Sequence, residues 1–130
     1  MNPDEIMEKP YWIIDILPGQ VPENSPGQYF RIEKYWMENQ TAEIRQKKFS
    51  LILKLNCYMQ ISIDGEINPS PEKIRNRIEG TDVSIRIGNA MIVSEKDDTY
   101  MTLFNPDKPL LAMIRKIASG EGLFIWKRQL

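Results

Sequence analysis

The chain has 130 residues, enough for one domain, and its 42% hydrophobic and 27% charged residues are typical of a folded globular protein rather than a disordered one. A net charge of −1 gives no electrostatic reason to expect nucleic acid or an anionic lipid surface as the main partner. The chain has no histidine and one cysteine, which excludes catalytic triads, Cys-His pairs and histidine metal sites.

The apolar runs and the single cysteine indicate the cellular compartment of the protein. The longest apolar runs, such as Leu110 to Ile114, are far too short to cross a bilayer. Acidic residues occupy the N-terminal positions where a signal peptide carries basic ones, and a lone cysteine cannot close an intramolecular disulfide. We therefore expect a cytoplasmic protein without a membrane-spanning segment.

A strand and an aromatic-rich helix are the first elements that the pattern predicts. Residues 11–17 are mostly β-branched or aromatic and stop at a Pro-Gly pair, which is typical of a strand. Ser25, Pro26 and Gln28 have the spacing of a capping box with proline at the first helical position, so we expect a helix over residues 26–38. Its inward stripe would consist of Tyr29, Ile32 and Trp36, with Phe30 and Met37 beside it.

The next segment, residues 49–59, fits two structures. Apolar residues occupy its odd positions from Phe49 to Met59, and this period of two is that of a half-buried strand. Phe49, Ile52 and Cys57 also share one face of a helix, so the helix stays open as an alternative. We expect the strand, with Cys57 packed in the core as an unreactive thiol.

Turn and cap signals divide the rest of the chain. We expect a short strand at residues 61–63 before an Asp-Gly turn, a surface helix between Ser70 and Gly80, and a helix between Asp107 and Gly120. Three strands joined by short connections should form an antiparallel meander, at residues 84–87, 91–93 and 100–104. A last strand at residues 123–126 is apolar on both faces, as a strand covered on two sides would be.

This order of elements predicts one compact α+β domain over residues 1–130. Its sheet should be mixed but mostly antiparallel, with about three helices, because short connections join most of the strands.

Acidic residues gather in two turns and offer the main alternative chemistry. Asp64 and Glu66 lie in one turn, and Asp97 and Asp98 lie in another. Paired carboxylates can hold a hard cation or share a proton, whereas acids in turns also serve local backbone hydrogen bonding. Neither turn has EF-hand spacing, so we expect no metal or cofactor, with these four carboxylates as the weaker alternative.

Aromatic residues give the leading functional hypothesis. Six of the twelve lie in the first 36 positions, and Tyr35 falls about 100° off the inward stripe of its helix. We therefore expect a non-enzymatic protein-interaction or adaptor domain that binds another protein or a second copy of itself. The residues expected at that surface are Tyr35, Trp36, Phe30 and Met37. A small-molecule-binding or carboxylate-based enzymatic domain is the alternative, and nucleic acid is not expected as a partner.

Overall fold

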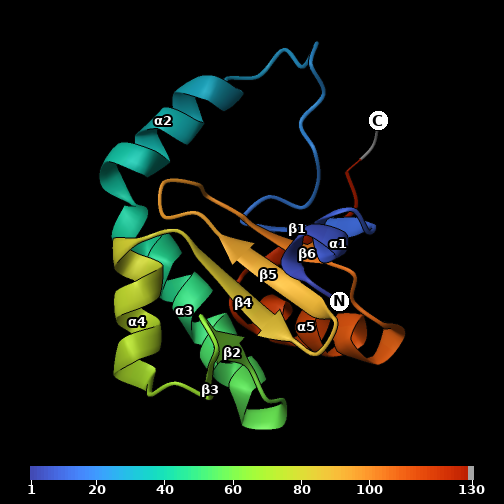
Figure 1. Ribbon diagram of the computed structural model, residues 1–130. Coiled ribbons are helices and arrows are strands. Elements are labelled where there is room, and N and C mark those ends of the chain that lie inside the picture. The colour runs from blue at the N-terminus through green and yellow to red at the C-terminus, as the bar shows by residue number, and fades with distance from the viewer. Residues whose placement is uncertain (129–130) are drawn as a thin grey trace.

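Seven strands form one sheet in the order β3-β2-β4-β5-β6-β1-β7 (Figure 1). The computed structural model describes residues 1–128 of the chain. Every pairing between neighbouring strands of this sheet is antiparallel, and the α+β class predicted from the sequence is confirmed. The strands are β1 (Tyr11–Asp15), β2 (Ser62–Ile63), β3 (Glu66–Ile67), β4 (Val83–Ile87), β5 (Ala90–Ser94), β6 (Met101–Phe104) and β7 (Phe124–Trp126).

Five helices accompany the sheet in residues 1–128, where about three were expected. They are α1 (Pro3–Met7), α2 (Tyr29–Asn39), α3 (Thr41–Tyr58), α4 (Pro71–Gly80) and α5 (Lys108–Gly120). Within these residues no helix combines the length and the apolarity needed to cross a bilayer. The short helix α1 was not predicted, although Asn2 and Glu5 cap each other: the Glu5 amide donates to Asn2 Oδ1 at 2.8 Å, and Asn2 Nδ2 donates to Glu5 Oε1 at 2.9 Å.

Elements with strong local signals form where they were predicted. The β4-β5-β6 meander pairs Val83 with Ser94 and Ser94 with Met101. Helices α4 and α5 begin at Ser70 and Asp107, whose side-chain oxygens accept amide hydrogen bonds at the first turn. These signals suffice because a cap involves residues only three positions apart.

Residues 49–59 do not form the expected strand but the second half of α3. The buried side chains of this helix recur every three or four positions, at Ile44, Lys48, Leu51, Ile52 and Leu55 among others. The inward face therefore begins upstream of the segment that looked like a strand. The prediction was wrong because so short an apolar run fits both periods, and only the longer helical pattern separates them.

Cys57 is corrected together with its helix. It lies on the exposed side of α3 rather than in a core strand. Its Sγ atom is 3.6 Å from the carbonyl oxygen of Leu53, one turn earlier in the same helix. The expectation of a thiol packed in a core strand is therefore wrong.

Two further expectations are corrected at the edges of the domain. Helix α2 begins at Tyr29 instead of residue 26, because the Ser25 hydroxyl accepts a bond from the amide of Gly27 at 3.4 Å and caps no helix. Strand β7 is not covered on two sides. It pairs only with β1 and forms an edge of the sheet, and its Phe124 side chain is exposed.

The two faces of the sheet are covered differently. Helices α3, α4 and α5 pack on one face, and Figure 1 shows α5 behind the strands and α1 in front of them. Alternation along β1 directs Ile14 into the helix-covered core and places Ile13 and Asp15 on the opposite face. That second face is covered by α1, which buries Ile6 completely, and by the segment that follows β1.

The segment of residues 16–39, which we name the arm, consists of a long loop and helix α2. Figure 1 shows the arm rising from the end of β1, standing off from the sheet and returning to the domain at α3. No residue of α2 is buried. The arm therefore contributes little to the core and leaves much of its own side-chain surface in solvent.

We expect Cys57 to react with an aromatic disulfide reagent in the native protein without any denaturant, because the thiol is exposed. The release of the coloured thiolate at neutral pH measures the rate, and Cys57→Ser supplies the baseline since the chain has no other thiol. Labelling that proceeds only in denaturant would contradict this placement of α3.

Candidate functional site

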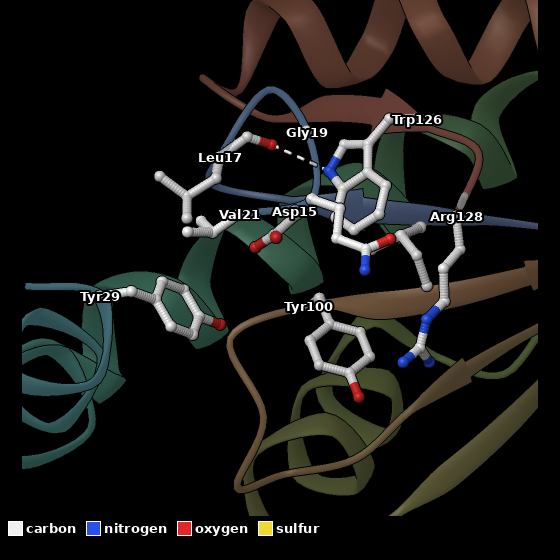
Figure 2. A pocket seen from close by; sticks show the side chains of 10 residues that line it. Asp15, Leu17, Gly19, Val21, Tyr29, Tyr100, Trp126 and Arg128 are labelled. Carbon is white, nitrogen blue, oxygen red and sulfur yellow. Dashed lines mark hydrogen bonds between the residues drawn. The ribbon is translucent and has the colours of Figure 1, made fainter. Parts of the chain in front are cut away.

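A cavity of about 240 Å³ lies where the arm leaves the end of β1 (Figure 2). Its floor belongs to the face of the sheet opposite the main helices, and residues of the arm line one side of it. Leu17, Val21 and Tyr29 of the arm, together with Ile13, Asp15 and Trp126 of the sheet, line most of it. Tyr100, which precedes β6, and Arg128, which follows β7, complete the wall. The cavity thus joins segments from both ends of the chain.

Asp15 is the buried charged group of this cavity. Its residue is 7% exposed, and Oδ1 accepts a hydrogen bond from the amide of Ile16 at 2.7 Å. Burial, with a smaller contribution from the Glu33 carboxylate, raises the pKa of the Asp15 carboxyl from its ordinary 3.8 to about 6. Backbone amides of Ile16 and Leu17 and the Lys48 ammonium oppose this rise only in part. None of the ion pairs in residues 1–128 includes Asp15.

Tyr29 connects helix α2 to the cavity. Its hydroxyl donates to Glu33 Oε2 at 2.8 Å, one helical turn away, and Figure 2 shows the hydroxyl end of the ring on the side facing the cavity. Burial and the bond to Glu33 raise the pKa of Tyr29 to about 12, so the phenol stays protonated at neutral pH. Tyr29 therefore offers an uncharged aromatic wall, although its proton is engaged with Glu33.

Lys48 of α3 fixes the turn that precedes Tyr100. The Lys48 ammonium is buried and donates to the carbonyl oxygens of Glu95 at 2.8 Å and Asp98 at 2.7 Å, which fixes the β5-β6 turn. Burial lowers the pKa of Lys48 to about 8, so the lysine is still mostly charged at neutral pH. Because Tyr100 follows this turn directly, Lys48 positions one wall of the cavity without touching it.

Trp126 secures the other side. Its indole Nε1 donates to the carbonyl oxygen of Leu17 at 3.0 Å, the bond drawn in Figure 2. This bond ties the root of the arm to edge strand β7, which pairs with the same part of β1 that ends in Asp15. The arm is thus anchored next to the cavity, even though α2 buries none of its residues.

The predicted binding residues lie on α2 and differ in exposure. Phe30 is 81% exposed and Tyr35 is 54% exposed, whereas Trp36 and Met37 are half-buried. Ile32, expected to face inward, is 43% exposed. It does not point into the core because α2 meets the domain only at its two ends, through Tyr29 and α3.

The four turn carboxylates remain divided between their two turns. Asp64 pairs with Arg77, and Glu66 pairs with Lys73 at 2.9 Å, so a shallow hollow beside α4 contains balanced charges. Asp97 is exposed, and the carboxyl of Asp98 bonds to that of Glu95 and raises its pKa. Among residues 1–128, no three acidic, cysteine or histidine side chains are placed to share a metal ion.

Sequence reasoning missed Asp15, the residue at the centre of the cavity. The available signal was an acid at the end of an otherwise apolar strand, in phase with Ile13 rather than with Ile14. That phase places a charged group on a sheet face, but what covers the face depends on the arm and on β7.

Comparison with protein families, with curated proteins and with solved structures finds no match to this chain. The functional argument therefore depends on the geometry of the cavity and of α2.

We expect Asp15→Asn to raise the free energy of unfolding at pH 7. The folded carboxyl, with a pKa near 6, holds a proton that the unfolded carboxyl releases near 3.8, so this residue makes the fold less stable as pH rises from about 4 to 6. The removable penalty is at most about 3 kcal/mol above pH 6 and vanishes below pH 4. Urea unfolding at pH 4 and pH 7 measures it.

The exposed Asp97 supplies the matched control. Asp97→Asn should leave the free energy of unfolding nearly unchanged at both pH values. If Asp15→Asn destabilises the protein at pH 7 as much as at pH 4, the ionised Asp15 carboxylate does not destabilise the fold as described above.

Proposed function

We propose that this protein is a non-enzymatic interaction domain and that two copies of it associate through α2. The observation that carries the proposal is that α2 buries none of its residues while presenting Phe30, Ile32 and Tyr35 to solvent. A monomer gains little from ordering such a helix, because its apolar side chains stay in water. Covering Ile32 and Tyr35, which lie about 60° apart around the helix, with a second copy removes that surface from water and gives the helix a packing role.

The outward stripe of α2 favours a second copy of the chain as the partner. Arg31, Tyr35 and Glu38 are spaced four and then three positions apart, so they lie along one side of the helix. In an antiparallel pair of these helices about a two-fold axis, Tyr35 meets Tyr35 of the partner subunit, and Arg31 meets Glu38 of the partner subunit. The stripe is therefore complementary in charge to itself when reversed.

The area available is compatible with a symmetric interface that includes more than the helix. Helix α2 has 11 residues and is about 16 Å long. A standard interface buries about 800 Å² on each partner, more than one short helix supplies. The exposed loop residues 22–28, which precede α2 in the arm, extend the same surface. We therefore infer that the loop and α2 dock together.

We expect the wild-type chain to sediment as a dimer at tens of micromolar and Tyr35→Glu to sediment as a monomer with unchanged circular dichroism. The charge would be buried without a partner at the two-fold axis. Tyr58→Glu is the matched control, because Tyr58 is 72% exposed at the far end of α3 and should leave the dimer intact. A wild-type chain that sediments as a monomer would contradict the proposal.

Charge reversal tests the antiparallel arrangement itself. Arg31→Glu and Glu38→Arg should each weaken self-association by about tenfold, because like charges then face each other across the axis. An equimolar mixture of the two variants should recover the association, since each acid of one chain then meets a base of the other. Sedimentation of the mixture and of each variant alone provides the measurement, and a mixture that associates no better than its components would exclude the antiparallel pairing.

A further inference from the structure

The Asp15 cavity has the composition of a site for a positively charged ligand. Its one buried ionisable group is an acid, and the acid receives hydrogen bonds from backbone amides but no ion pair from the side chains of residues 1–128. A buried carboxylate without a cation partner is costly to a fold unless something compensates it. A positively charged ligand would supply the compensating charge.

Three aromatic rings line the same cavity. Tyr29 comes from α2, Tyr100 from the residue before β6, and Trp126 from β7. Figure 2 shows Tyr29 and Tyr100 on the side of the cavity toward which Asp15 points and Trp126 above it. Aromatic faces attract organic cations, and they do so more strongly where water is excluded. A carboxylate surrounded by rings is the arrangement that recognises ammonium groups.

We propose that this cavity binds a small organic amine as its ammonium ion, with Asp15 as the counter-ion and Tyr29, Tyr100 and Trp126 as the aromatic walls. The volume of about 240 Å³ lies below the range of roughly 300–1,000 Å³ found for drug-sized ligands, so the ligand is small. The apolar side chains of Ile13 and Val21 provide space for a hydrocarbon or aromatic body behind the ammonium.

Other ligand classes fit the cavity less well. A metal ion would need several oxygen ligands, and Asp15 is the only carboxylate among the lining residues. An inorganic anion would meet the charge of Asp15 and, close by, that of Glu33. Arg128 lines the cavity too, but it forms no ion pair with Asp15 in the described residues, and Figure 2 shows its guanidinium directed away from that carboxylate.

A titration with matched probes tests the site. Phenethylammonium chloride is the probe, and 2-phenylethanol is its control because a hydroxyl replaces the ammonium at the same position. In two-dimensional ¹H-¹⁵N spectra of the full chain at pH 7.5, we expect the amine to shift the Trp126 indole signal and the Ile16 amide, with the Trp36 indole unmoved. The alcohol should bind at least about tenfold more weakly.

Variants assign the effect to the carboxylate. Asp15→Asn should lower the affinity for phenethylammonium by about tenfold or more, whereas Asp97→Asn should leave it unchanged. Tyr100→Leu should also weaken binding by severalfold, because it removes a wall while keeping an apolar side chain. Equal affinity for amine and alcohol, an unaffected Asp15→Asn variant, or no shift up to about 10 mM amine would each overturn the proposal.

Lowering the pH provides a separate readout. The Asp15 carboxyl has a pKa near 6, so at pH 5 about one in ten molecules is ionised and the affinity for the amine should fall about tenfold. The charged and titratable groups around Asp15 are Glu33 and Tyr29 of α2, Lys48 of α3, Tyr100 and Arg128. Of these, Glu33 is the only other carboxyl group, and Glu33→Gln should keep most of the pH dependence. An affinity that is flat from pH 5 to 7.5 would contradict the role of Asp15.

Discussion

The main helices cover only one face of the sheet, and the remaining features of the molecule depend on this asymmetry. The core side chains of β1, β4, β5 and β6 alternate toward α3, α4 and α5, where they form the main apolar cluster. The opposite residues of the same strands must be covered by something else. Helix α1 covers part of that face, and the arm covers the end where Asp15 lies.

This division explains why a buried charged residue occurs at the end of β1. On the helix-covered face an unpaired carboxylate would displace close-packed apolar groups. On the opposite face the same carboxylate meets a cavity closed by a loop, with aromatic side chains and backbone amides around it. The raised pKa of Asp15 reflects that environment, which is dry enough to disfavour the charge.

The arm links the two proposals physically. Tyr29 is both the first residue of α2 and a wall of the cavity, and the bond from Trp126 to Leu17 fixes the start of the arm on the sheet. If α2 docks onto a second copy of the chain, the position of Tyr29 is held from outside as well as by its bond to Glu33. Association through α2 would then stiffen the cavity, while amine binding needs only the wall residues to be in place.

Interactions between residues close in sequence were determined by the sequence itself. The caps at Ser70 and Asp107 involve residues three positions apart. The two connections of the β4-β5-β6 meander join strand ends three and seven positions apart, so the pattern of residue types sufficed to place these elements. Tyr35 is exposed as expected, although the stripe from which its exposure was inferred does not face the core, because Ile32 is exposed as well. The tertiary structure decided which period residues 49–59 adopt, because the helix face they complete begins at Ile44 and is selected by packing against the sheet.

Tertiary structure also decided the place of Asp15. An acid at the end of an apolar strand can face water, a partner or a cavity with equal local preference. Its environment here is built by Tyr29, Tyr100 and Trp126, which are separated from it by up to most of the chain and brought together by the pairing of β1 with β6 and β7. The burial and the pKa of such a carboxyl depend on residues that are distant in sequence. A pattern of adjacent residues therefore does not predict them.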